Sequence, residues 1–258
     1  MKNRTEVVAI YFPNYHRAPH NEAYYGEGWT EWELVRNAPS RFTGHHQPKV
    51  PVWGCYDASD PAWAAREIDC AADHGITCFL VDWYWYSGVQ TMQRQLEEGF
   101  LKANNRSRLK FALMWANHPW MNVFPVDAGR TAAEMNCWLP IRHSMTDMER
   151  VADYCIEHYF REPSYWRIGG RPYFSFFSFD TLEKSLGGAA GVRRALERFD
   201  ARVHAAGLPG MHFNVNIANV NVTVLCWDMS LIARAKEAGF HSVFGYNITS
   251  TPSLRIWS

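Results

Sequence analysis

The sequence predicts an α/β domain in which short strands alternate with helices around a parallel sheet. Six β-branched or aromatic runs bounded by turn residues are typical of strands, and they cover residues 7–12, 77–83, 110–116, 172–178, 211–217 and 242–247. Helical stretches fall between most of these runs. Three of the joins from helix to strand carry a glycine, at Gly75, Gly207 and Gly239. This alternation favours right-handed βαβ units.

The clearest helix is predicted from Asp60 to His74. Asp60 suits the N-cap, Pro61 the first helical position, and Gly75 the left-handed residue that ends a helix. The chain then passes directly into the apolar strand that begins at Thr77. Such a continuous apolar strand fits a parallel sheet that is covered on both faces.

Two long connections interrupt the alternation, at residues 13–59 and 118–171. The second contains a predicted helix, whose start is indicated by the capping-box pattern Thr146-x-x-Glu149. Long connections after strands build the active sites of (β/α)8 barrels. An open doubly wound sheet is the alternative architecture. No glycine-rich phosphate loop follows any strand, so its nucleotide-binding form is disfavoured and no cofactor is expected.

Composition excludes several classes of partner. The 258 residues are 47% hydrophobic and 20% charged, which suits one globular domain spanning residues 1–258. Lys plus Arg and Asp plus Glu number 26 each, so no excess positive charge is present to hold nucleic acid. No run approaches the roughly 20 apolar residues of a membrane span. The N-terminus lacks an apolar signal segment, which predicts a cytoplasmic protein.

Metal-binding patterns are also missing from the sequence. The six cysteines form no C-x-x-C pair, and buried free thiols are the simpler interpretation. His45 and His46 are adjacent but have no third ligand nearby in the sequence. We therefore expect no metal site.

Aromatic residues make up 15% of the chain, with 12 tryptophans, and many lie at the predicted strand ends beside amides. Sugar rings present apolar C–H faces and a rim of hydroxyls, which aromatic and amide side chains bind together. We expect these side chains to converge into one groove that binds a glycan. Packing between strands and helices is the alternative for any one of them, and strand alternation prevents Trp83, Tyr84 and Trp85 from all facing one groove. The candidate substrate-binding residues are Tyr11, Tyr15, His16, Trp29, Trp32, Trp83, Trp85, Trp115, Asn117, Trp120, Asn216 and Tyr246.

Glycosidic bond cleavage usually requires two carboxyl groups, one acting as acid and the other as base or nucleophile. Glu31 and Asp82 are the catalytic candidates, with a binding or structural role as the alternative for each. Asp82 ends a strand among aromatic residues, where burial would raise its pKa. Glu27 lies between two glycines, as in a plain turn. His118, like His16, is a candidate for binding hydroxyls or a satisfied loop histidine.

Several motifs in order along the chain resemble the glycoside hydrolase family 99-like, WbsX-type proteins. These motifs are residues 9–16, Gly28-Trp-Thr-Glu-Trp32, Gly44-His-His-Gln-Pro48, Tyr56-Asp57, Asp60-Pro61, Asp82-Trp-Tyr-Trp85, Trp115-Ala-Asn117 and residues 238–247. The resemblance implies a TIM-type (β/α)8 barrel that acts on glycans. Some members cleave α-mannosides, and others occur in O-antigen or surface polysaccharide biosynthesis, often labelled glycosyltransferases. Three functions follow as hypotheses: a glycoside hydrolase, a glycosyltransferase-like protein, or an inactive fragment that binds glycan.

The sequence departs from the family's pattern at two places. Relatives commonly continue Trp-Ala-Asn with Glu, whereas His118 follows Asn117 here. The family also continues past Tyr246 into further strands, one carrying acidic residues implicated in catalysis, whereas this chain ends at Ser258. We therefore expect a C-terminally truncated, incomplete barrel with about six of eight strands. The open edges of such a sheet would invite self-association.

Overall fold

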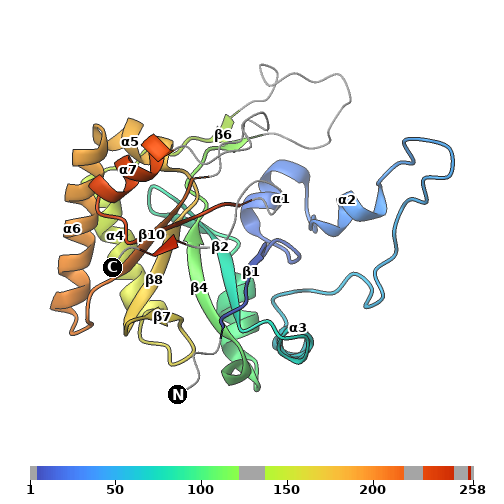
Figure 1. Ribbon diagram of the computed structural model, residues 1–258. Coiled ribbons are helices and arrows are strands. Elements are labelled where there is room, and N and C mark those ends of the chain that lie inside the picture. Colours follow the sequence, from blue (N-terminus) through green and yellow to red (C-terminus); the bar gives the residue numbers. More distant parts are fainter. Residues whose placement is uncertain (1–4, 122–136, 218–228, 247–254, 257–258) are drawn as a thin grey trace. The chain divides into compact units, whose positions relative to one another are not determined.

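The computed structural model describes residues 5–121, 137–217, 229–246 and 255–256 (Figure 1). The chain divides into two compact units. Of the described residues, 5–83 and 90–110 belong to the first unit. Residues 84–89, 111–121 and the described part from 137 onward belong to the second. That the chain forms one domain stays a prediction.

All six predicted strands are present, and their pairing is parallel as expected. They are β1 (Val8–Tyr11), β2 (Cys78–Tyr86), β4 (Lys110–Trp115), β8 (Arg171–Phe176), β9 (His212–Asn216) and β10 (Ser242–Phe244). In the first unit β1 pairs with β2, and in the second β4, β8, β9 and β10 pair in that order. Five shorter strands were not predicted: β3 (Val89–Thr91), β5 (Trp120–Met121), β6 (Cys137–Leu139), β7 (Arg167–Ile168) and β11 (Arg255–Ile256).

The helices of the first unit include the predicted one, which is α3 (Pro61–Asp73). Asp60 caps it, because the Asp60 carboxylate accepts a hydrogen bond of 2.8 Å from the Ala62 N–H. The connection over residues 13–59 is less irregular than expected, since it contains α1 (Pro19–Tyr25) and α2 (Trp32–Arg36). Short helical turns η1 (Gln95–Gly99), η2 (Phe100–Lys102) and η3 (Arg106–Arg108) complete the unit's described helices.

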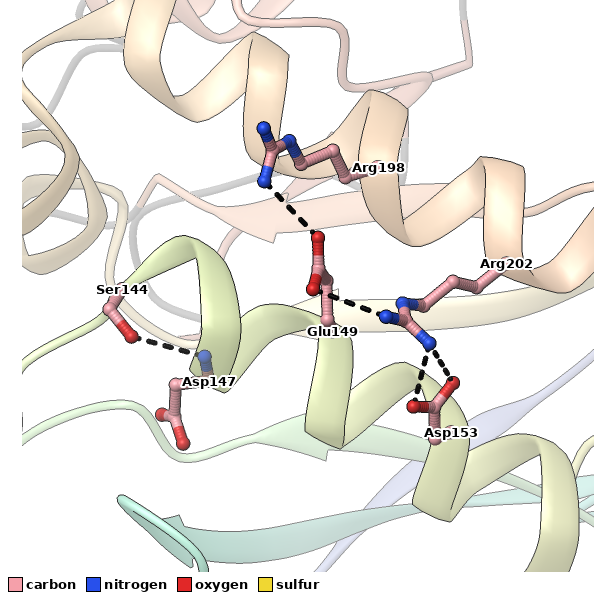
Figure 2. A network of polar contacts seen from close by, with 6 residues as sticks. All are labelled: Ser144, Asp147, Glu149, Asp153, Arg198 and Arg202. Atoms are coloured by element: carbon pink, nitrogen blue, oxygen red, sulfur yellow. Dashed lines mark hydrogen bonds and ion pairs between the residues drawn. The ribbon is translucent and has the colours of Figure 1, made fainter.

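The second unit contains α4 (Met145–His158), α5 (Phe179–Leu186), α6 (Ala189–Ala205) and α7 (Met229–Glu237). The predicted capping box was placed two residues too late. Ser144 is the N-cap of α4 and accepts a hydrogen bond of 3.0 Å from the Asp147 N–H, so Thr146 lies in the first turn (Figure 2). Ser144-x-x-Asp147 overlaps Thr146-x-x-Glu149, and the helix begins at the earlier pattern.

Helices α4 and α6 are joined by an ion-pair network on their exposed faces (Figure 2). Glu149 of α4 lies 3.2 Å from both Arg198 and Arg202 of α6, and Asp153 lies 2.8 Å from Arg202. Exposed ion pairs individually contribute little, so this network adds only modestly to the stability of the contact between the two helices.

The strands of the second unit separate apolar from polar side chains. Phe174 and Phe213 pack against Phe199 of α6, with ring centroids 5.4 Å apart in both pairs. On alternate positions Ser175, Asn214 and Ser242 are fully buried and form a hydrogen-bonded chain with distances of 2.8 Å. Because buried polar groups must find partners, this chain lets the strands carry a polar face.

No helix among the described residues is long and apolar enough to cross a membrane.

Candidate functional site

Glu31 lies in the first unit, immediately before α2, and is held by two buried asparagines. The Asn14 amide donates to Glu31 Oε2 at 2.6 Å, and the Asn21 amide donates to Asn14 Oδ1 at 2.6 Å. Both asparagines are almost completely buried. Burial raises the pKa of Glu31, and the hydrogen bond from Asn14 opposes that rise. The site therefore orients this carboxyl group in a largely buried position.

Two aromatic side chains accompany Glu31. The rings of Tyr15 and Trp32 lie 4.3 Å apart, and the Trp32 indole donates to the Tyr56 carbonyl at 2.6 Å. The pKa of Tyr15 is raised by burial and then by the charge of Glu31. Trp29, also a predicted site residue, stacks on Tyr25 at 4.4 Å.

Asp82, the second catalytic candidate, lies on β2 beside the buried Trp83. Its Oδ1 is buried and has no hydrogen-bond partner among the described residues. Burial raises the pKa of Asp82 to about 7, so the carboxyl group is about half protonated at neutral pH. His16 is completely buried, and burial lowers its pKa to about 4, which keeps the ring neutral at neutral pH.

Tyr11 contacts α3. Its hydroxyl donates to Glu67 at 3.0 Å, and the Tyr56 hydroxyl donates to the same carboxylate at 2.6 Å. Burial raises the pKa of Glu67, and the two hydroxyls oppose that rise. Glu67 was not among the predicted site residues. Its spacing was a usable signal, since Glu67 follows Ala64 by three residues and therefore lies on the buried side of α3.

Two predicted tryptophans of the second unit are hydrogen-bonded into its core. The Trp85 indole donates to Asp147 Oδ1 at 3.0 Å, and the Trp115 indole donates to the Trp85 carbonyl at 3.2 Å. Both rings are buried, and Trp115 packs edge-on against His143 at 4.7 Å. These contacts favour a packing role for the two tryptophans, which was the alternative weighed for each.

Asn117 joins β4 to the segment that precedes α5. Its Oδ1 accepts from the Ser178 N–H at 2.7 Å, and its amide donates to the Ser178 carbonyl at 2.8 Å. The same amide lies 3.3 Å from His143 Nε2. This bonding uses both ends of the Asn117 side chain to position the loop.

A row of edge-to-face rings follows the carboxyl ends of strands in the second unit. We call it the aromatic arc; in order, its members are Trp120, Tyr84, His118, Phe177 and Tyr246. Successive ring centroids lie 5.6, 6.4, 5.3 and 5.2 Å apart. The Tyr246 side chain is 39% exposed, which leaves one end of the arc open to solvent.

Asn216 supports the arc from β9. Its amide donates to the Phe177 carbonyl at 3.1 Å, and its Oδ1 accepts from the Tyr246 N–H at 3.2 Å. The arc therefore contains the predicted residues Trp120 and Tyr246 together with the candidate His118, and the predicted residue Asn216 is bonded to it. Phe177 was not among the predicted site residues, although it lies in the predicted strand over residues 172–178 and directly follows the observed β8.

The predicted site residues thus form two sets, one in each unit. The first centres on Glu31, Tyr15 and Trp32, and the second on the aromatic arc. That the two sets line one groove stays a prediction. No group of three or more His, Cys, Asp or Glu side chains is arranged for a metal ion within the described ranges.

Comparisons with known proteins give the context of these two sets. A family model described as Glycosyltransferase WbsX matches residues 7–245. The WxcX proteins of two Xanthomonas campestris pv. campestris strains are 31% identical over 168 residues, which cover 64% of this chain and 23% of each relative. The chain thus spans about a quarter of the length of these relatives.

A solved structure supports the fold. The GH99 endo-alpha-mannosidase from Bacteroides thetaiotaomicron aligns with 94% of this chain at a TM-score of 0.53 and 14% identity. The aligned part is 59% of that enzyme's chain. The α/β architecture built on a parallel sheet is therefore confirmed, and the sequence match over residues 7–245 shows that the chain belongs to the WbsX glycosyltransferase family.

Proposed function

We propose that this chain is a carbohydrate-active domain of glycoside hydrolase type, acting on a glycan that contains α-mannosides. The observation that carries the proposal is the environment of Glu31. A carboxyl group with a raised pKa, fixed by Asn14, lies beside the rings of Tyr15 and Trp32. The mannosidase-like fold and the family membership support the same class of substrate.

In this proposal Glu31 is the general acid. A protonated carboxyl group donates its proton to the glycosidic oxygen as the bond to the anomeric carbon breaks. Burial raises the pKa of Glu31, which is the direction a general acid requires, and the hydrogen bond from Asn14 orients the group. The faces of Tyr15 and Trp32 suit the apolar side of a pyranose.

Asp82 is the second carboxyl group of the proposal. With a pKa of about 7, a substantial fraction of it is ionised at neutral pH and can act as base or nucleophile. The aromatic arc, with its exposed end at Tyr246, is proposed to bind sugar rings within the second unit.

A glycosyltransferase-like role in surface polysaccharide biosynthesis is the second candidate, favoured by the family's description. It would require an activated sugar donor, whereas hydrolysis requires only water. Dependence of turnover on a nucleotide-sugar donor separates the two functions.

The test is to incubate the protein with α-mannan oligosaccharides, with and without GDP-mannose, and to measure new reducing ends for hydrolysis and released GDP for transfer. Hydrolysis without donor is expected, and Glu31→Gln should lower its rate by about 100-fold or more, the usual contribution of a general acid. Glu33→Gln is the matched control, because Glu33 is two residues away and is ion-paired with Arg36 on the exposed side of α2.

Three results would contradict the hydrolase proposal. Turnover only with donor favours the transferase, and binding without turnover favours a glycan-binding fragment. Equal rates for Glu31→Gln and wild type would remove Glu31 from the chemistry.

A further inference from the structure

A second cluster of aromatic rings lies in the first unit, where the segment before α3 packs on that helix. Tyr56 stacks on Trp63 at 4.9 Å, and Trp53 lies 6.4 Å from Trp63. The guanidinium carbon of Arg66 lies 4.5 Å from the Trp53 ring centre and 5.1 Å from that of Trp63. We call Trp53, Trp63 and Arg66 the tryptophan–arginine cluster.

The Arg66 guanidinium is exposed and makes no hydrogen bond or ion pair with any described residue. Two other arginines of the first unit form ion pairs: Arg36 pairs with Glu33, and Arg108 pairs with Asp69 and Asp73. The two tryptophan faces restrict the orientation of the Arg66 side chain, since a guanidinium stacks on aromatic rings. Its N–H donors consequently remain available to a ligand.

These residue types together match one ligand chemistry. A planar guanidinium binds a carboxylate through two parallel hydrogen bonds, and a half-buried tryptophan face binds the C–H side of a pyranose. A uronic acid carries both features on one ring. A neutral sugar would contact the tryptophan rings but would offer no negatively charged group to Arg66.

We propose that the tryptophan–arginine cluster binds a carboxylate-bearing sugar, so that the glycan recognised by this protein is acidic. The cluster is packed to the candidate catalytic residues through rings: Tyr56 lies 5.4 Å from Trp32, and Trp32 lies 4.3 Å from Tyr15. The inference rests on the proposed function in that the ligand is a glycan. It concerns binding at a separate cluster and does not require turnover.

The experiment measures binding by calorimetry. The probes are tetrasaccharides of galacturonate and of mannuronate, each compared with its carboxyl-reduced, neutral form. We expect at least one acidic tetrasaccharide to bind about five- to tenfold more tightly than its neutral form, with the preference shrinking at high salt. Arg66→Gln should abolish this preference while leaving the affinity for the neutral form unchanged.

Further variants test the geometry. Arg66→Lys keeps the charge but loses the planar fork, so it should retain only part of the preference. Trp53→Ala should weaken binding of acidic and neutral forms alike. Arg36→Gln is the matched control, because it removes an exposed arginine of the same unit that is already paired, and it should change nothing.

The proposal is overturned if neither acidic tetrasaccharide is preferred over its neutral form, or if Arg66→Gln and Arg36→Gln behave alike. In either case Arg66 only covers the tryptophan rings. The outcome is independent of the hydrolase test, since preference for the acidic probe with no turnover would remove the proposed catalysis and keep the site.

Discussion

The carboxyl group of Asp82 should make the stability of this protein depend on pH, and Asp82→Asn should remove that dependence. The side chain is only 6% exposed, and burial raises its pKa from the usual 3.8 to about 7. Each pKa unit corresponds to about 1.4 kcal/mol. Ionising Asp82 in the folded protein therefore costs about 4 kcal/mol of unfolding free energy relative to an Asp82 that stays neutral.

The direction follows from proton binding. Because the folded pKa lies above the unfolded one, the folded protein binds more protons between pH 4 and 7. The contribution of Asp82 is fully present below about pH 4, falls as the pH rises through 7, and is constant above that. His16, His143 and His212 have pKa values lowered by burial to about 4 and titrate in the opposite sense between pH 6.5 and 4. The difference between variant and wild type cancels their effect.

Urea unfolding at pH 4 and pH 8.5 measures this difference. Asp82→Asn should match wild type within about 1 kcal/mol at pH 4 and exceed its stability by about 4 kcal/mol at pH 8.5. Asp60→Asn is the control, because Asn caps a helix as well as Asp and Asp60 is exposed. A difference between Asp82→Asn and wild type that is the same at both pH values would refute the burial of an ionisable Asp82.

Two substitutions test how the strand ends and η1 are held. Asn117→Ala removes both hydrogen bonds to the Ser178 backbone, so it should lower the free energy of unfolding by about 2–4 kcal/mol in urea titrations, while Asn104→Ala, at an exposed position, should have little effect. Gly99→Ala would place a Cβ atom 2.5 Å from the Ala58 carbonyl oxygen, so a loss of about 1–3 kcal/mol is expected in thermal or urea unfolding. A wild-type unfolding midpoint for Asn117→Ala would show that its hydrogen bonds contribute no net stability. A wild-type midpoint for Gly99→Ala would show that the backbone near Ala58 adjusts without cost.

Local signals predicted the strands and several helix ends well. Apolar runs bounded by turns located all six parallel strands, and Gly75 and Gly207 end their helices with positive φ angles of 88° and 80°. The signals failed where two patterns overlapped, as at Ser144 and Thr146, because both residues can cap and only packing of α4 selects between them. Short helices such as α1 were missed because helices of seven residues depend on tertiary contacts rather than on propensity.

The candidate site was predicted less completely than the fold. Strand-end position singled out Tyr246, and the motif Gly28-Trp-Thr-Glu-Trp32 in the first long connection singled out Glu31 and Trp32; the structure places these residues in the two sets described above. The partners that define their chemistry were not visible, since Asn14 and Asn21 resemble ordinary loop residues in the sequence. Trp85 and Trp115 fit the same sequence criteria but are bonded into the core.

The sequence by itself determined the order of strands and helices, the glycines that end helices, and the family to which the chain belongs, because these depend on neighbouring residues and on motifs in order. Only the tertiary structure decided which side chains meet. Tyr11 and Glu67 are 56 residues apart, and their hydrogen bond exists because β1 packs on α3. Arg66 likewise lies over Trp53 because the segment before α3 packs on that helix. Hydrogen bonds, burial and pKa values depend on distances between residues that are far apart in the sequence, and local sequence patterns do not determine those distances.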